Sequence, residues 1–519
     1  MCLSLVQSRA LIGLQSPPVT VEVHLANGLP SFTLVGLADV EVKEARERVR
    51  SALQNSGFDF PSNQRITVNL APADLPKDSG RFDLPIALGI LAASGQIDGA
   101  RLSHYEFAGE LSLSGALRPF RGALVMGLAL YQQTHAHHLV LPPGSAEEAA
   151  LVPGTIVYRA QHLRAVANHF LKAGQPCDDP APDEWSRVVC PQEAENTTSP
   201  QHLDLSDVKG QVGPKRALEI AAAGQHSLLM VGPPGAGKSM LAHRFTGLLP
   251  NLSVQEALEA ASVASLAGRF DLSQWRNRTT RHPHHSASAV ALVGGGSPPR
   301  PGEISLAHHG VLFLDELPEF PRNALEALRE PMESGTVTIS RAAHRAEFPA
   351  RFQLIAAMNP CPCGYSGQIR QPGQQGPVCR CTPDQINRYQ QKISGPLLDR
   401  IDLHIEVPSQ SASHLLSAPA GENTEHIKLR CHQARLFAHA RQGCSNQALA
   451  GSAIDKHVAL GPDAKDYLLH VATHLGWSGR STHRVLKVAR TIADLAQSQH
   501  IEAAHIAEAV QYRRPFHQH

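Results

Sequence analysis

The residues from Gly232 to Ser239 combine small side chains, one lysine and one hydroxyl in the order of a phosphate-binding loop. They read Gly232, Pro233, Pro234, Gly235, Ala236, Gly237, Lys238 and Ser239, and Met240 follows them. An apolar run precedes the loop and a predicted helix follows it, which is the context that this motif requires. Backbone N–H groups of such a loop, with the partial positive charge of the helix N-terminus, surround phosphate oxygens. We expect ATP here, with Lys238 on its β- and γ-phosphates and Ser239 on Mg²⁺.

Two carboxylates follow a second apolar run further along the chain. Residues 311–314 read Val-Leu-Phe-Leu, and Asp315 and Glu316 come directly after them. A buried strand delivers such residues at its carboxyl end, where α/β sheets bind ligands. We expect Asp315 to hold the Mg²⁺ shell together with Ser239, and Glu316 to polarise the attacking water.

Three further polar residues come later in the chain. Asn359 ends an apolar run, Arg400 lies between a predicted helix end and another strand, and Arg480 lies in a Ser-Gly-Arg-Ser stretch. Each is a weak signal alone, because a lone arginine is more often part of a surface ion pair. Their order after the phosphate-binding loop favours a role beside ATP.

Four cysteines form two close pairs, Cys361 with Cys363 and Cys379 with Cys381. Four thiolates in such pairs suit tetrahedral Zn²⁺. The residues between the pairs are too polar to form a packed core, so a loop of this kind needs a bound metal or a cross-link to be ordered. We expect a structural zinc ion. Unmetallated thiols or a redox pair remain the alternatives.

Two insertions carry candidate DNA contacts. In one, Arg341, His344 and Arg345 lie at the predicted tip of a hairpin, between two β-type runs. In the other, Arg300 follows a glycine-rich turn. Basic side chains there would bind phosphates without reading sequence, whereas the alternative is an ordinary solvated hairpin. The adjacent His284 and His285 could be metal ligands, but neighbouring residues converge poorly on one ion, so we favour a structural or ring-contact role.

The predicted helices and strands that position these residues fall into four segments of the chain. The predicted parts are an α+β segment (1–173), a linker rich in Pro and Asp (174–201), an α/β core with a parallel sheet (202–410) and a helical region (411–519). In the last part helices are expected from about Thr424, Pro462, Ser481 and Ile501.

Composition narrows the class of protein. The chain has 519 residues, of which 42% are hydrophobic, and 47 basic against 46 acidic residues give a net charge of +1. That balance argues against a globally basic nucleic-acid coat protein but allows a local basic stripe. The sequence has no long apolar run and no signal-like N-terminus, so we expect a cytoplasmic protein without a membrane partner.

The motifs of the core resemble the AAA+ ATPases, in the branch with magnesium-chelatase ATPase subunits and MCM helicases. The resemblance implies that Asn359 is sensor 1, that Arg400 is an arginine finger acting on a neighbour's ATP, and that Arg480 is the sensor 2 arginine of a helical lid. It also implies a homohexameric ring, a helix-2 insert, and a pre-sensor 1 hairpin facing the pore.

A stretch of the N-terminal segment resembles the active site of Lon proteases. Lys77 and Asp78 match that pattern, but Arg81 stands where the nucleophilic serine would be, and Leu124 falls near the catalytic lysine. The nucleophile can therefore be neither formed nor activated, and a shifted role for Ser79 is the minor alternative. The resemblance implies a Lon-like fold (ribosomal S5 domain 2-like) without proteolysis.

Nearly the whole chain resembles the magnesium-chelatase-like family that includes ComM and YifB. This resemblance implies a hexameric ATP-dependent DNA helicase that promotes branch migration of recombination intermediates during natural transformation. Its expected partners are single-stranded and branched double-stranded DNA, and recombinase-type proteins remain open. The alternatives are a chelatase-type motor that remodels a partner protein, an ATP-dependent protease and a non-enzymatic DNA-binding ring.

Overall fold

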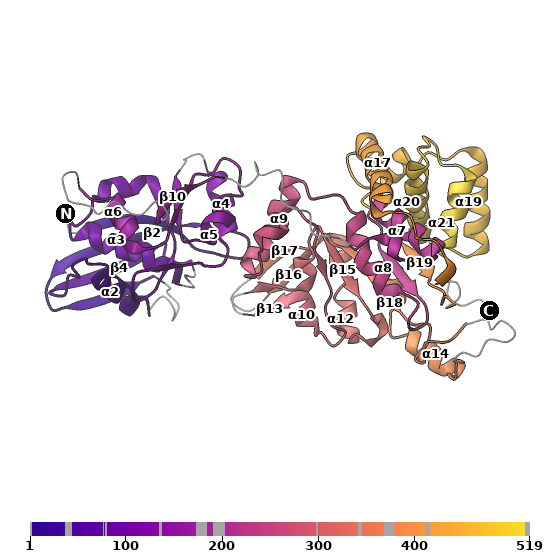
Figure 1. Cartoon of the computed structure of the whole chain (residues 1–519), viewed down its shortest axis with the longest axis horizontal. Coiled ribbons are helices and arrows are strands. Elements are labelled where there is room, and N and C mark those ends of the chain that lie inside the picture. Colours follow the sequence, from indigo (N-terminus) through magenta and orange to yellow (C-terminus); the bar gives the residue numbers. More distant parts are fainter. Residues whose placement is uncertain are drawn as a thin grey trace. The chain divides into compact units, whose positions relative to one another are not determined.

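The structure is a computed structural model in which the chain forms two compact units (Figure 1). Unit one comprises residues 1–198 and 258–275, and unit two comprises residues 199–257 and 276–519. The structure describes residues 3–36, 44–75, 77, 80–133, 137–172, 184–189, 203–296, 299–340, 345–367, 378–411 and 416–513.

Unit one is built on a mixed sheet of eight strands in the order β10-β9-β8-β5-β1-β2-β4-β3. β2 pairs antiparallel with β1 and β4, whereas β8 runs parallel to β5 and β9. Alternate residues of β2 are buried, because successive side chains of a strand point to opposite faces. The strands are β1 (Leu3–Arg9), β2 (Pro18–Asn27), β3 (Ser31–Val35), β4 (Gln64–Ala71), β5 (Tyr105–Phe107), β8 (His138–Leu141), β9 (Val157–Ala160) and β10 (Trp185–Val188).

Helices pack against this sheet and close the core of unit one. The central helix α3 is apolar all round and nearly all of its side chains are buried, as expected of a helix within a core. A short hairpin, β6 (Glu110–Leu111) and β7 (Leu117–Arg118), lies beside it. The helices are α2 (Ala45–Asn55), α3 (Asp83–Ala93), α4 (Ala123–Tyr131), α5 (Ser145–Ala149) and α6 (Leu163–His169).

Unit one differs from the predicted boundaries in two places. Strand β10 lies within the segment predicted as a linker, and it is paired there because its backbone forms an antiparallel ladder with β9. Residues 258–275, predicted as part of the α/β core, pack with the N-terminal segment. The Ser265 hydroxyl donates to Glu148 (2.6 Å) and accepts from the backbone N–H of Gly122 (3.2 Å). The residue pattern could not predict these contacts, because they join residues that lie far apart in the sequence.

Unit two contains the predicted parallel sheet. Its five strands run in the order β12-β15-β18-β11-β19, and every pair in it is parallel. β11, β15 and β18 are buried along their whole length, as expected for strands covered on both faces. The strands are β11 (Leu228–Val231), β12 (Thr280–Arg281), β15 (Val311–Leu314), β18 (Gln353–Met358) and β19 (Leu403–Glu406).

Two antiparallel hairpins extend from this sheet, at the positions of the two insertions. They are β13 (Gly294–Gly295) with β14 (Arg300–Pro301), and β16 (Thr336–Ser340) with β17 (Arg345–Pro349). The hairpin predicted from the two β-type runs is therefore confirmed. The helices of the sheet region are α7 (Val212–Gly224), α8 (Lys238–Phe245), α10 (Ala289–Val293), α11 (Glu303–Leu306), α12 (Arg322–Glu326), α13 (Pro331–Ser334), α14 (Pro383–Gln390) and α15 (Gly395–Leu398). Helix α9 (Val254–Leu266) begins in unit two, and its residues from 258 onward belong to unit one.

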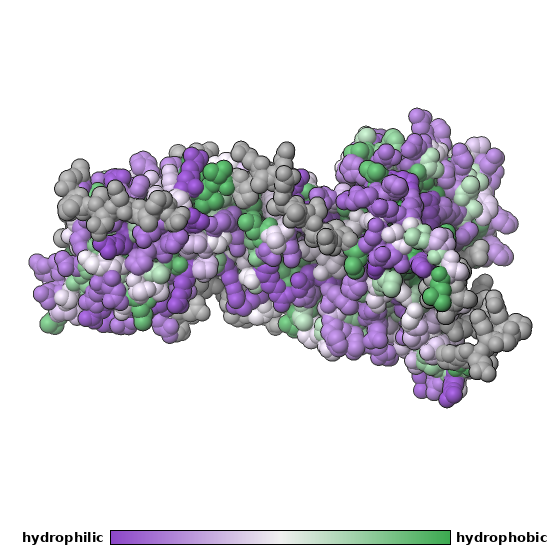
Figure 2. Space-filling model, in the orientation of Figure 1, coloured by the Kyte–Doolittle hydropathy of each residue, from purple (hydrophilic) through white to green (hydrophobic). Residues whose placement is uncertain are grey.

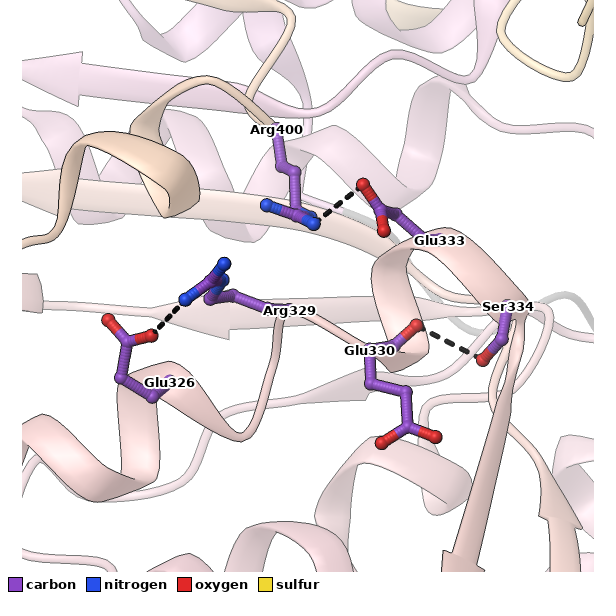
Figure 3. A pocket seen from close by; sticks show the side chains of 6 residues that line it. All are labelled: Glu326, Arg329, Glu330, Glu333, Ser334 and Arg400. Carbon is purple, nitrogen blue, oxygen red and sulfur yellow. Dashed lines mark hydrogen bonds and ion pairs between the residues drawn. The ribbon is translucent and has the colours of Figure 1, made fainter.

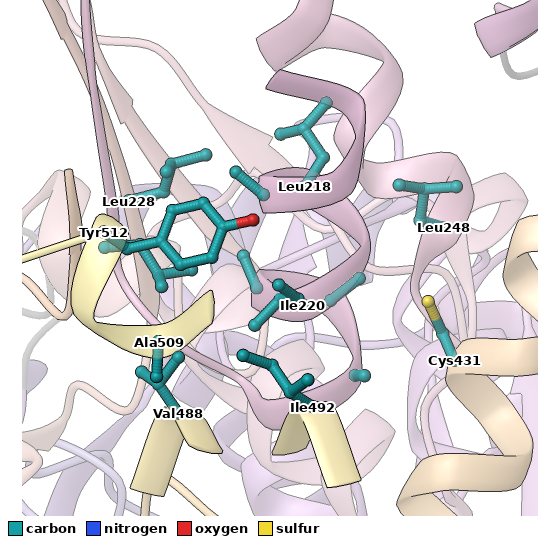
Figure 4. Close-up of a cluster of buried hydrophobic side chains, with 14 of the residues drawn as sticks. Leu218, Ile220, Leu228, Leu248, Cys431, Val488, Ile492, Ala509 and Tyr512 are labelled. Carbon is teal, nitrogen blue, oxygen red and sulfur yellow. The ribbon is translucent and has the colours of Figure 1, made fainter. Parts of the chain in front are cut away.

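The C-terminal part of unit two is helical, and it shares one hydrophobic core with the sheet. Figure 4 shows Val488 and Ile492 of α20 in one cluster with Ile220 of α7, and Tyr512, directly after α21, beside Leu228 of β11. Because one core joins both parts, the helical region is packed as a continuation of the α/β core. The helices are α17 (Thr424–Gln442), α18 (Ser452–His457), α19 (Pro462–His474), α20 (Gly479–Leu495) and α21 (Ala503–Gln511).

Hydrophilic side chains cover most of the face shown in Figure 2. Among the described residues, no helix has both the length and the apolar character that a membrane span requires.

Replacing Ile492 by alanine should destabilise unit two. Ile492 is buried in the shared core, so the variant loses apolar contacts and leaves a cavity, at a cost of about 2–5 kcal/mol in the free energy of unfolding. Chemical denaturation followed by circular dichroism measures this loss. The exposed Leu436 of α17 provides the matched control, since Leu436→Ala should change stability by less than about 0.5 kcal/mol. Equal losses in both variants would contradict the shared core.

Candidate functional site

The candidate site lies where three buried strands of unit two end. β18 lies between β15 and β11 and runs parallel to both, so the carboxyl ends of the three strands meet at one edge of the sheet. The residues that follow them are Gly232, Asp315 and Asn359. This edge is where open α/β sheets bind ligands.

The phosphate-binding loop connects β11 to α8. Gly237 has a φ of 93°, a left-handed conformation that favours glycine, and it caps the N-terminus of α8. Lys238 and Ser239 are therefore the first residues of the helix, whose N–H groups point into the loop. This geometry is the one predicted for binding phosphate.

Lys238 is buried, and its ammonium group has three partners. It donates to the carbonyl oxygens of Gly232 (2.6 Å) and Pro233 (2.9 Å), and to Oδ1 of Asn359 (3.0 Å). Burial lowers the pKa of Lys238, while the charges of Asp315 and Glu316 oppose that shift. The structure thus brings the loop lysine and the predicted sensor amide together, although 121 positions separate them in the chain.

A second hydrogen bond joins the phosphate-binding loop to a strand end, between Ser239 and Asp315. The Ser239 hydroxyl donates to Oδ2 of Asp315 at 2.7 Å, which joins α8 to the end of β15. A hydroxyl and a carboxylate at this spacing are suitable oxygen ligands for Mg²⁺, which prefers such groups. Glu316, the next residue, has a φ of 52°, an uncommon conformation for a side chain other than glycine. Its backbone N–H donates to Asp315, while its carboxylate is half exposed.

One residue at the site was not predicted to be there. His285 places Nδ1 3.1 Å from Oε2 of Glu316, so a histidine of the insertion that also carries Arg300 contacts the predicted catalytic carboxylate. The sequence singled out the His284–His285 pair but gave no reason to connect it with Glu316. Spacing along the chain carries no such signal, because the contact depends on how the insertion folds back over β15.

Arg400 and Arg480 converge on one carboxylate, that of Glu333. Nη2 of Arg400 lies 2.6 Å from Oε1 of Glu333, and Nη2 of Arg480 lies 3.5 Å from the same oxygen. Figure 3 shows Arg400 and Glu333 pointing toward one another at a surface pocket. Within the described part of the chain, neither arginine contacts Lys238 or Asp315, so the structure does not bring them into the site of this subunit.

The four predicted zinc ligands come together. The sulfur of Cys361 lies 3.3 Å from that of Cys363 and 3.8 Å from that of Cys379, and the Cys381 sulfur lies within 4.8 Å of the other three. Four thiols at this spacing fit a tetrahedral zinc site. The turn that carries the first pair touches the phosphate-binding loop, because a side chain at Gly364 would collide with the ring of Pro234.

The candidate DNA contacts are only partly described. Arg300 and Arg345 are exposed, each on a strand of one of the two hairpins. Arg341 and His344 lie outside the described residues. Both described arginines offer a charge to solvent, and their contact with DNA stays a prediction.

In unit one, the positions of the predicted protease-like stretch serve packing. Lys77 is buried and donates to the carbonyl oxygen of Pro72, and Leu124 is buried on α4. Arg81 is buried as well, with its guanidinium 5.1 Å from the ring of Phe120. Asp78 and Ser79 lie outside the described residues. An arginine in such a setting has no nucleophile to offer.

Three family models match the chain. "Magnesium chelatase, subunit ChlI" matches residues 204–415, "Subunit ChlI of Mg-chelatase" matches residues 21–145, and "Magnesium chelatase, subunit ChlI C-terminal" matches residues 421–513. Together they cover the candidate site, most of unit one and the C-terminal helices.

Full-length relatives match as well. The chain is 49% identical to "Competence protein ComM" of Haemophilus influenzae, over 99% of this chain and 98% of that protein. It is 48% identical to "Uncharacterized protein YifB" of Escherichia coli, over 99% of this chain and 97% of that protein. "DNA replication licensing factor MCM4" of Oryza sativa is 25% identical over 36% of this chain and 20% of its own length.

Lys238→Ala should weaken ATP binding, because it removes the cation at the centre of the loop. We expect the Kd for a fluorescent ATP analogue to rise at least about tenfold, which corresponds to about 1.4 kcal/mol. The exposed Lys456 provides the matched control, and Lys456→Ala should leave the Kd unchanged. Equal affinity of all three proteins would show that the loop does not bind the nucleotide.

The purified protein should contain close to one zinc ion per chain, as measured by elemental analysis. Replacing Cys361 and Cys363 by serine should abolish that zinc, because thiolates supply the ligands. The same variant should bind ATP more weakly, since the cysteine turn packs against Pro234. Cys444→Ser is the matched control, a thiol outside the cluster that should retain full zinc content. Zinc-free wild-type protein, prepared without chelators, would overturn the site.

Proposed function

We propose a function from one premise: the chain belongs to the family of ComM and YifB, the magnesium-chelatase-type AAA+ proteins. It is an ATP-dependent DNA helicase that works as a homohexamer and promotes branch migration of recombination intermediates during natural transformation. The cluster of Lys238, Asn359, Ser239 and Asp315 at the end of the parallel sheet is the observation that carries this proposal.

The chemistry follows from the position of each group. Lys238 and the N–H groups at the start of α8 bind the phosphates, and Asn359 holds the lysine in place. Ser239 and Asp315 would hold Mg²⁺, which would supply charge that stabilises the transition state. Glu316 orients and polarises the attacking water, and His285 positions its carboxylate.

Arg400 acts on the ATP of the next subunit. Within the described part of its own subunit it contacts Glu333 and Pro396, away from the loop of Lys238, so its phosphate partner lies across an interface. A contact of this kind joins unlike surfaces of neighbouring subunits, and a ring closes such contacts. Arg480, at the start of α20, adds a second cation from the helical lid.

The DNA proposal rests on the hairpins and on two relatives. Arg345 and Arg300 are exposed on hairpins that extend from the sheet, where a positive charge in each subunit gives a ring a basic inner stripe. Arg341 and His344 complete that stripe in the proposal. One relative is named for competence and another for DNA replication licensing, which supports DNA as the substrate.

The remaining parts have supporting roles. Unit one is a Lon-like domain without protease activity, because Arg81 replaces a nucleophile. The four cysteines would hold a structural zinc ion, which would fix the loop beside Pro234. The whole ring works in the cytoplasm, where its DNA partners and any recombinase-type proteins are found.

A second function has one specific observation in its favour. The family models that cover residues 204–415 and 421–513 are named for a magnesium-chelatase subunit. A motor of that type would use the same ATP chemistry to remodel a partner protein. DNA-stimulated ATP hydrolysis separates the two functions, since a protein-remodelling motor does not require DNA.

The decisive experiment is strand displacement on forked and three-stranded DNA with ATP. The wild-type protein should release the labelled strand, because hydrolysis moves the basic hairpins along DNA phosphates. Rising salt should suppress this activity steeply, since phosphate contacts release counterions.

Lys238→Ala controls for passive strand melting and should release no strand. Arg345→Ala tests the DNA contact, and it should lower displacement while leaving ATP binding unchanged. Wild-type protein that hydrolyses ATP without displacing any strand would contradict the helicase and favour the chelatase-type motor.

A further inference from the structure

A surface pocket of unit two brings several charged side chains together beside the predicted arginine finger. Figure 3 shows two arginine–glutamate pairs in it, Arg400 with Glu333 and Arg329 with Glu326. Its lining consists of Glu326, Arg329, Glu330, Glu333, Ser334 and Arg400. Among these, Glu333 has no role yet in the proposed reaction.

The guanidinium of Arg400 is bound within its own subunit. It is 8% exposed, lies 2.6 Å from Oε1 of Glu333, and donates from Nη1 to the carbonyl oxygen of Pro396 at 2.8 Å. The hydrogen bond from Arg400 lowers the pKa of Glu333, and the charges of Arg480 and Arg484 act in the same direction. Glu333 is therefore an anion that neutralises the positive end of Arg400.

The same carboxylate also contacts the helical region. Nη2 of Arg480, at the start of α20, lies 3.5 Å from Oε1 of Glu333. Arg484, one turn further along α20, donates to the carbonyl oxygen of Arg400 at 2.8 Å. Glu333 thus joins the two arginines that the proposed mechanism assigns to ATP.

Glu333 is also tied to the hairpin that carries the proposed DNA contacts. It lies in α13, which ends at Ser334, and only Gly335 separates that helix from β16. The Ser334 hydroxyl donates to the carbonyl oxygen of Thr336 (3.0 Å), and the backbone N–H of Ala350 donates to Gly335 (2.7 Å). These bonds clamp the base of the hairpin to α13, so a displacement of β16 moves Glu333.

An arginine that is paired with a carboxylate is a poor partner for phosphate. A neighbour's phosphate must displace Glu333, and a buried guanidinium that loses one partner must gain another. The strength with which Glu333 holds Arg400 therefore sets how readily the arginine acts across the interface.

We propose that Glu333 is a positioning residue that holds Arg400 and Arg480 back from ATP and couples their release to movement of the β16–β17 hairpin. The inference rests on the proposed function, because it takes Arg400 as the residue that acts on the neighbour's ATP. DNA bound at the hairpin shifts α13, and the exchange of Glu333 for phosphate follows.

The test measures ATP turnover with and without single-stranded DNA for Glu333→Gln, which removes the charge but keeps the shape. Basal turnover should rise about threefold, the effect of losing one partly exposed ion pair. The ratio of ATP turnover with DNA to turnover without DNA should fall toward 1, since the hairpin no longer controls Arg400. In the double variant Glu333→Gln/Arg400→Ala, the basal rise should disappear.

Glu330→Gln is the matched control. It removes a carboxylate from the same pocket, whereas the ion pair of Arg400 is with Glu333, and its basal and stimulated rates should equal those of wild type. Thermal melting checks that every variant is folded.

Wild-type rates in Glu333→Gln would overturn the inference and leave the proposed function standing. Loss of both basal and stimulated turnover in that variant would also overturn it, because Glu333 would then only be needed to orient Arg400. Wild-type protein without any ATP turnover would contradict the proposed function itself.

Discussion

The parallel order of five short strands in unit two is the constraint on which the rest of the structure depends. Because β11, β15 and β18 run in the same direction, the residues that follow them meet at one edge. Two hydrogen bonds across that edge, Lys238 to Asn359 and Ser239 to Asp315, join residues that lie 121 and 76 positions apart. Reversing any one strand would move its polar residue to the opposite edge and separate the pair.

The opposite edge of the same sheet, where β11 and β19 begin, holds a buried charge. Asp402, just before β19, accepts hydrogen bonds from Arg484 (2.5 Å) and from the backbone N–H of Ser227 (3.2 Å). Burial would raise the pKa of Asp402, but hydrogen bonding by His226 and the charge of Arg484 lower it instead. A buried charge is tolerated when it is paired and hydrogen-bonded. Arg484 also donates to the carbonyl oxygen of Arg400, so the network links α20 to the segment that carries Arg400.

Sequence patterns predicted the parts that have a local signal. The phosphate-binding loop, the apolar run before Asp315 and the paired cysteines each combine a fixed spacing with a fixed residue type, so the parallel sheet and the cysteine cluster could be anticipated. The contacts of Glu333 and His285 could not, because each joins a half-exposed carboxylate or imidazole to a residue on another element. Strand β10 was missed for a related reason. Its residues lie in a polar segment, and only the partner strand β9 shows that they pair.

The groups that would contact ATP and Mg²⁺ all have partners within the chain. Lys238 is bound by carbonyl oxygens of its own loop, Ser239 by Asp315, and Arg400 by Glu333. Binding of a nucleotide is therefore an exchange of hydrogen bonds, and its free energy is the difference between the old and the new contacts. Each new contact with a phosphate or with Mg²⁺ requires that an existing contact break, so the positions of the present partners affect the exchange. The elements that carry the exchanged partners, β15 for Asp315 and α13 for Glu333, are therefore the routes by which movement elsewhere in the subunit reaches the phosphates.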